Sequence, residues 1–115
     1  MVTSQYIFKG RGIEGKITGF VRDYFVSAYE SSYKGGFIRV FEDSSYFNKK
    51  NYLVLIRVDT TEAEDGIIRI EIIAGGGDDS LFVNGVFGGD RSRAKSFARA
   101  LQDFCTENFI DYDSV

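Results

Sequence analysis

The chain has 115 residues, a formal net charge of −3, one cysteine and no histidine. This length fits one domain with a single core, so we expect residues 1–115 to fold as one unit. The absence of histidine excludes Ser-His and Cys-His nucleophile pairs, His-ligated zinc and the usual neutral-pH proton shuttle. An enzyme of this composition would depend on carboxylates, Lys, Tyr or a cofactor, and a carboxylate-dependent hydrolase is the enzyme class that stays open. We expect a protein that is not an enzyme, with no cofactor and no metal ion.

The net charge gives no overall attraction to nucleic acid or to anionic lipid. A single cysteine excludes an internal disulfide and favours a reducing compartment. The start of the chain, MVTSQYIFKG, lacks a basic segment followed by an apolar core, so no signal peptide is predicted. The apolar runs are far shorter than the roughly 20 residues that span a bilayer. We therefore expect a soluble cytoplasmic protein without a membrane partner.

The first elements in chain order are a short strand over 5–9 and a helix over 13–29. Apolar residues in the second segment recur at intervals of three and four, which is typical of one helix face. They are Ile13, Ile17, Phe20, Val21, Tyr24, Phe25 and Ala28. The stretch SSYKGG ends this helix, with Gly35 or Gly36 as a suitable C-terminal cap.

Three strands follow at 37–42, 52–59 and 67–74, each rich in Val, Ile and aromatic residues. The glycine-rich stretch 75–92 is interpreted as a turn, a short irregular strand at 81–87, a second turn and a helix N-cap at Asp90 or Ser92. A closing helix over 92–108 has an apolar stripe. The stripe consists of Ala94, Phe97, Ala98, Leu101, Phe104 and Cys105.

This order, β-α-β-β-β-(β)-α, predicts an α+β fold. Because both helices have one apolar stripe, the economical arrangement is a two-layer sandwich. Two helices then lie on one face of a mainly antiparallel sheet of four to five strands.

Alternation along the strands predicts which side chains face the helices. The predicted inward set is Ile38, Val40, Val54, Ile56, Val58, Ile68, Ile70 and Ile72. The opposite face, here called the open face, receives Phe37, Arg39, Phe41, Leu53, Leu55, Arg57, Ile67, Arg69, Glu71 and Ile73. It mixes three arginines with large apolar groups, which is more apolar than a purely solvated surface requires.

The open face supports three interpretations. Arginine and aromatic residues are enriched in interface cores, so the face is a candidate surface for self-association as a homodimer. Alternatively, Arg39, Arg57, Arg69 and Glu71 form cross-strand pairs, and the N-terminal strand or the C-terminal tail covers the apolar groups. The third interpretation is binding of a small anionic ligand. The candidate residues are Phe37, Arg39, Phe41, Leu53, Leu55, Arg57 and Arg69.

A second candidate site is the basic start of the last helix, where Arg91, Arg93, Lys95 and Arg99 lie close together in the sequence. An α-β-β-β-α order that ends in a basic helix is similar in outline to a double-stranded-RNA-binding domain, a family that contacts phosphates at this helix. The consecutive lysines of that family are missing, and the loop TTEAEDG is acidic. A solvated helix face is therefore favoured, and nucleic acid is not the expected partner.

The acidic residues predict no metal site. A calcium loop that starts at Asp78 would place Phe82 where an oxygen ligand is required. The carboxylates between Asp59 and Asp65 are expected to keep a hairpin loop solvated. Cys105 lies on the apolar stripe of the last helix, so we expect a buried small side chain and not a reactive thiol.

The run from Ala74 to Leu101, AGGGDDSLFVNGVFGGDRSRAKSFARAL, follows three predicted strands. It resembles the final third of a family of small bacterial α+β proteins of unknown function, which have a glycine-rich turn, a short aromatic strand, a glycine-containing bend and a closing helix. The resemblance implies the same architecture and a bacterial type of protein. It implies no activity and no site residues.

Overall fold

The computed structural model describes residues 2–24, 28–44, 51–75 and 93–115. These residues form an α+β fold with two α-helices and one antiparallel sheet of six strands. The elements are β1 (Val2–Lys9), α1 (Ile13–Tyr24), β2 (Tyr29–Tyr33), β3 (Gly36–Ser44), β4 (Asn51–Asp59), the 3₁₀ turn η1 (Ala63–Asp65), β5 (Ile67–Gly75), α3 (Arg93–Glu107) and β6 (Asp111–Ser114).

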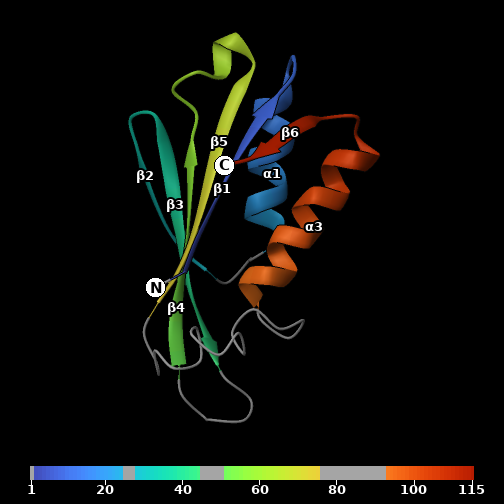
Figure 1. Cartoon of the computed structure of the whole chain (residues 1–115). Helices are drawn as coiled ribbons and strands as arrows, with labels where there is room; N and C mark the ends of the chain where they lie inside the picture. The colour runs from blue at the N-terminus through green and yellow to red at the C-terminus, as the bar shows by residue number, and fades with distance from the viewer. Residues whose placement is uncertain (1, 25–27, 45–50, 76–92) are drawn as a thin grey trace.

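The strand order across the sheet is β2-β3-β4-β5-β1-β6 (Figure 1). Consecutive strands pair from β2 to β5, and β1 then pairs with β5 on one side and with β6 on the other. Both helices cover the same face of this sheet. Their buried residues form one core with the inward residues of β1, β3, β4 and β5.

The core contains the apolar residues that recur at helical spacing in the helices and at every second position in the strands. Ile13, Ile17 and Val21 point inward from α1 at the spacing of one helix face. In β4 and β5 every second residue is buried, from Val54 to Val58 and from Ile68 to Ala74. One face of the sheet is therefore closed by the helices, and in the described residues no helix covers the other face.

The predicted fold class is confirmed, but the predicted number and order of strands are wrong. The helix expected over 13–29 ends at Tyr24, and β2 forms where the sequence indicated the end of a helix. The strand β6 was not predicted. The strand expected at 81–87 and the N-cap at Asp90 or Ser92 lie outside the described residues.

The short strand β2 depends on its turn rather than on strand propensity. Lys34 and Gly35 form a two-residue connection between Tyr33 and Gly36, which are paired in the sheet. Gly35 has φ 100, a value that side chains with a Cβ rarely adopt. The glycine expected to cap a helix therefore closes a hairpin.

The prediction of which residues of β3 face the helices is also wrong. Phe37 and Phe41 are buried, and Arg39 is only 5% exposed, so all three lie on the face that the helices cover. The pairing agrees, because these residues lie opposite Val58, Val54 and Ile56 of β4 respectively. Ile38 and Val40, which were expected to point inward, are half-buried and lie on the open face.

Candidate functional site

The open face is divided by the strand register into an apolar part and a polar part. Tyr29, Val40, Leu55 and Ile73 lie side by side on β2, β3, β4 and β5. We call these four residues, together with Leu53 one step along β4, the apolar strip. Tyr29 is 67% exposed and Leu53 is 54% exposed, whereas the other three are half-buried. The strip crosses four strands without a charged residue.

The next row along the strands is polar on β4, β5 and β1, where side-chain bonds join its members. Arg57 Nη2 lies 3.2 Å from Glu71 Oε1 on the neighbouring strand. Gln5 Nε2 of β1 donates to the other oxygen, Glu71 Oε2, at 2.8 Å. One row further, Arg69 donates to Glu62 Oε2 from Nη2 at 2.9 Å and from Nε at 3.2 Å. The charges of this part of the face are therefore largely compensated within the chain.

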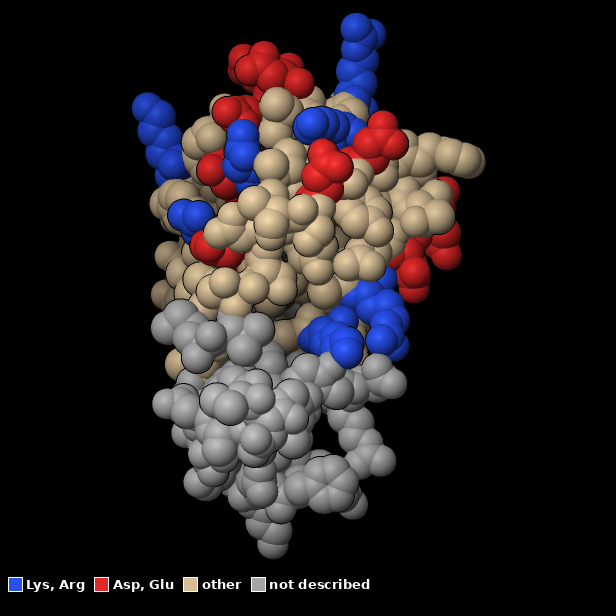
Figure 2. All heavy atoms as spheres, in the orientation of Figure 1, with Lys and Arg blue, Asp and Glu red and all other residues tan. Residues whose placement is uncertain are grey.

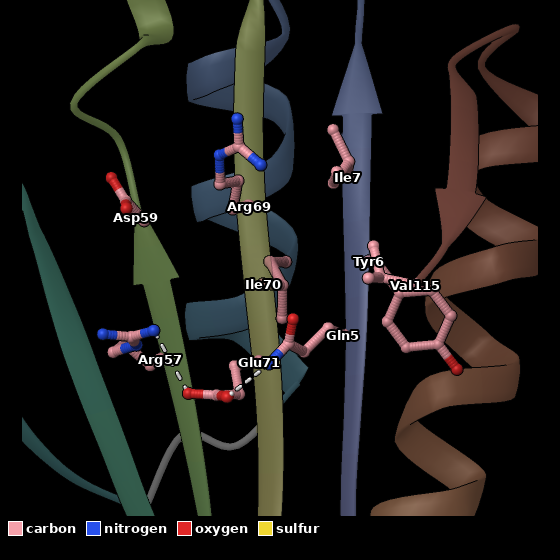
Figure 3. A pocket seen from close by; sticks show the side chains of 9 residues that line it. All are labelled: Gln5, Tyr6, Ile7, Arg57, Asp59, Arg69, Ile70, Glu71 and Val115. Carbon is pink, nitrogen blue, oxygen red and sulfur yellow. Dashed lines mark hydrogen bonds and ion pairs between the residues drawn. The ribbon is translucent and has the colours of Figure 1, made fainter.

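A hollow of about 120 Å³ opens on the polar part of the face. Figure 3 shows Arg57, Glu71 and Gln5 in a line across β4, β5 and β1, with Asp59 and Arg69 beside them. Donors and acceptors alternate around the hollow, so its chemistry suits a single polar side chain better than a large apolar ligand. The lining residues are Gln5, Tyr6, Ile7, Arg57, Asp59, Arg69, Ile70, Glu71 and Val115.

The carboxylate of Asp59 is fixed in its charged form at the end of β4. Thr61 donates to Asp59 Oδ1 from its hydroxyl at 2.6 Å and from its backbone N–H at 2.9 Å. These bonds, and after them the charges of Arg57 and Arg69, lower the pKa of Asp59 below its usual value of 3.8. Asp59 therefore stays ionised at neutral pH, when it can accept hydrogen bonds but not donate them.

The structure separates the three arginines that the sequence placed together. Arg57 and Arg69 lie on the open face, as the alternation predicts, and their role in an interface stays a prediction. Arg39 instead points toward the helices, where its Nη1 lies 3.2 Å from Glu30 Oε1. The same oxygen accepts from Arg22 Nε at 3.0 Å, and the Arg22 guanidinium lies 4.1 Å from the centre of the Phe37 ring. Arg39 is therefore part of a charged cluster that attaches β2 to α1.

The basic patch predicted at the start of the last helix is described only in part. Arg91 lies outside the described residues, and Arg93 begins α3. Lys95 and Arg99 are exposed and one helical turn apart. Figure 2 shows basic side chains gathered beside the grey region, at the level where α3 begins in Figure 1.

Cys105 and the acidic residues are the other chemical candidates. Cys105 is fully buried, and desolvation raises the pKa of its thiol to about 11, so the expectation of a buried small side chain is confirmed. The stretch from Asp78, in which the sequence predicts no calcium loop, lies outside the described residues. In the part of the chain that is described, acidic and cysteine side chains do not gather in threes as a metal ion would need.

Sequence reasoning missed exposed aromatic residues at two places, on β2 and after α3. Tyr29 and Tyr33 are exposed on the edge strand β2, and they were missed because the sequence predicted helix or loop there. Phe109 is 95% exposed and has φ 57. It follows α3 in a Schellman arrangement, in which Ile110 N–H donates to Cys105 O at 2.8 Å and Phe109 N–H to Thr106 O at 3.4 Å. Glycine usually occupies this position, so a phenylalanine here carries no sequence signal of the turn.

Comparison with protein-family models, with curated proteins and with solved structures finds no match for this chain. Neither α-helix of the described residues is long and apolar enough to cross a membrane.

Proposed function

We propose that this protein is a small assembly module that self-associates through the open face. The observation that carries the proposal is the apolar strip, which lies on the side of the sheet away from both helices. Exposed apolar surface that is continuous across several strands is typical of interaction sites. The occupant proposed here is a second copy of the chain.

The distribution of polar groups supports a protein partner over a small anionic ligand. Arg57 and Arg69 are both engaged by carboxylates of the same chain, so neither offers an uncompensated positive charge. Arg39 is buried on the opposite face and cannot contact a ligand there. A strip of apolar residues beside a polar row matches the core and rim of a protein interface.

Light scattering coupled to size-exclusion chromatography tests this proposal over a range of concentrations. We expect an average mass above the 12.9 kDa of one chain. The fraction of associated chains should rise with protein concentration. The variant Leu53→Lys places a charge on the apolar strip at a residue that is already half exposed, so the fold should tolerate it. This variant should dissociate at concentrations at which the wild type remains associated.

Phe109→Lys is the matched control, because it also replaces an exposed apolar residue by lysine, at the turn between α3 and β6. It should leave the mass unchanged. A wild-type chain that remains at 12.9 kDa at every concentration would overturn the proposal. Equal dissociation by both variants would also contradict it, because the effect would then not belong to the apolar strip.

The alternative function is binding of an anionic partner such as RNA at the start of α3. It is favoured by one observation, the exposed pair Lys95 and Arg99 on a chain whose net charge is negative. Such binding should weaken steeply as salt rises, because counterions are released from the phosphates. Fluorescence anisotropy with labelled RNA at low salt measures it, and unchanged anisotropy would leave this alternative without support.

A further inference from the structure

The two edges of the sheet differ in how they are protected against pairing with another strand. The edge strand β6 is short and has Asp111 and Asp113 on the open face, and Asp113 pairs with Lys9 at 3.6 Å. Charged residues of this kind discourage another strand from pairing. The other edge, β2, has the sequence YESSY. Its one charged side chain, Glu30, points to the helix side and is engaged by Arg22 and Arg39.

Some backbone N–H and C=O groups of β2 point away from its neighbour β3, at the edge of the sheet. Thr60 N–H donates to Gly35 O at 2.8 Å, which makes Gly36 and Asp59 a pair that does not exchange hydrogen bonds with each other. The N–H and C=O of Gly36 therefore point to β2, where they bond to Tyr33. Because the bonding direction alternates along a strand, the backbone groups of Ser31 and Tyr29 also bond to β3. It follows that the N–H and C=O groups of Glu30 and Ser32 point to the free edge. In the described residues no further strand accepts them.

The sequence of β2 is self-complementary in the antiparallel direction. With Ser31 on a two-fold axis, Ser31 lies opposite Ser31 of the second copy. Glu30 then lies opposite Ser32, and Tyr29 opposite Tyr33. Glu30 and Ser32 exchange both backbone hydrogen bonds in this register, through their N–H and C=O groups at the edge of the sheet. The tyrosines occupy non-hydrogen-bonded positions, where side chains on neighbouring strands lie closest and aromatic pairs stabilise a sheet.

We propose that β2 pairs antiparallel with β2 of a second copy about Ser31, which joins two sheets of six strands into one continuous sheet. This contact is made by the edge of the sheet, and Tyr29 is the one residue that it shares with the apolar strip. The occupant is identified by the pattern of β2 itself. No like charges face each other in this register, because each Glu30 meets a serine. Centring the pair on Glu30 would instead place two carboxylates opposite each other, which destabilises a sheet.

A cysteine at position 31 tests the register directly. The two Cα atoms of a non-hydrogen-bonded antiparallel pair are about 4.5 Å apart, within the range that a disulfide can bridge. The only native cysteine, Cys105, is buried and its pKa is raised to about 11, so it does not compete. Under mild oxidation, Ser31→Cys should give a covalent dimer on a non-reducing gel, at twice the 12.9 kDa of one chain.

Ser32→Cys is the matched control, since it introduces an exposed cysteine on the same strand one residue away. In the proposed register the two Cα atoms at position 32 are roughly 8 Å apart, from a rise of about 3.4 Å per residue and a strand spacing of about 4.8 Å. That distance is too long for a disulfide. Ser32→Cys should therefore remain a monomer on the same gel, and equal cross-linking of both variants would overturn the proposal.

A charge exchange gives a second test that does not depend on oxidation. Ser31→Lys and Ser31→Asp each place like charges on the axis, so neither should form the edge pair alone. A mixture of the two should form a heterodimer, which native mass spectrometry separates from the homodimers by mass. Absence of heterodimer in the mixture, together with failure of Ser31→Cys to cross-link, would overturn the edge contact.

These results separate the edge contact from the contact through the open face. If Leu53→Lys lowers the mass in solution while Ser31→Cys does not cross-link, the face contact stands and the edge contact is wrong. If Ser31→Cys still cross-links in the Leu53→Lys background, the edge contact stands by itself.

Discussion

The two faces of the sheet use the same residue types under different constraints. On the covered face, a charged side chain needs an opposite charge within the chain, and the charge of Arg39 is paired with that of Glu30. On the open face, Arg57 and Glu71 are also paired, but water reaches them. An arginine in a strand therefore does not by itself identify the solvent side. For Arg39 the partner, Glu30, identifies the face, and this partner lies on the neighbouring strand β2.

The two faces should differ most in how much free energy of unfolding is lost when a side chain is shortened, and two successive residues of β4 test this. Ile56 is fully buried against the helices, whereas Leu55 is half-buried on the open face. Ile56→Ala should lower the free energy of unfolding by about 2–5 kcal/mol, because it leaves a cavity in a packed core. Leu55→Ala should cost only about 1 kcal/mol in the dilute chain.

Urea denaturation followed by circular dichroism measures both losses. Repeating it at high protein concentration sharpens the comparison. If a second copy covers the open face, the cost of Leu55→Ala should grow with concentration and that of Ile56→Ala should not. Equal costs for the two variants in the dilute chain would show that the faces do not differ in burial.

A smaller difference is expected between the two carboxylates that pair with arginine. Glu30→Gln removes the charge that faces the buried Arg39, and we expect a loss of about 1–2 kcal/mol because Arg39 is desolvated. Glu71→Gln should cost at most about 1 kcal/mol, since its partner Arg57 is half exposed. The urea midpoints of the two variants, measured in the same buffer, decide the order. The reverse order would mean that the open face holds the more desolvated pair.

The smallest expected effect is a dependence of stability on pH, caused by Asp59 in the polar part of the open face. The pKa of Asp59 is below its usual value of 3.8 in the folded chain, so its stabilising contribution is present above about pH 4. It is lost as the pH falls through the folded value. Thr61→Ala removes the hydroxyl that contributes most to this shift, and the pKa of Asp59 should rise toward its usual value.

A carboxyl titration by NMR follows the pKa of Asp59 in the wild type and in Thr61→Ala. Thr18→Ala is a control, because the Thr18 hydroxyl bonds to Glu14 O on α1 and does not contact Asp59. An unchanged pKa in Thr61→Ala would show that the backbone N–H of residue 61 and the arginines, and not the threonine hydroxyl, hold the carboxylate in its charged form.

The sequence predicted the elements whose periodicity is strong. The three strands β3, β4 and β5 and the helix α3 lie within two residues of their expected bounds, because branched apolar residues alternate in the strands and recur at helical spacing in α3. The open-face positions of Leu53, Leu55, Arg57 and Arg69 follow from the same alternation. These elements are specified locally, so a local pattern is enough to find them.

The remaining features depend on partners that are distant in the sequence or lack a strong pattern. In FIRVF both alternating sets are apolar except for Arg39, so alternation alone cannot choose the buried set. The choice is made by Glu30, which lies on β2, and β2 itself has no branched apolar residue. The strand β6 is acidic and short, and it is held by pairing with β1. The edge of the sheet at β2, and with it the self-complementary pattern, was therefore not predictable from local sequence.

The position of β1 between β5 and β6, one strand from the edge of the sheet, has a consequence for folding. During synthesis β1 is made first, yet its partner β5 follows only after more than 50 residues, since Val2 pairs with Ala74 and Lys9 with Ile67. The consecutive strands β2 to β5 can pair as soon as each is made, whereas β1 must wait. Long-range pairing of this kind slows folding because the intervening loop must be closed first. The chain should therefore form its four-stranded meander early and insert its first strand late, when the free edge of β5 is finally covered.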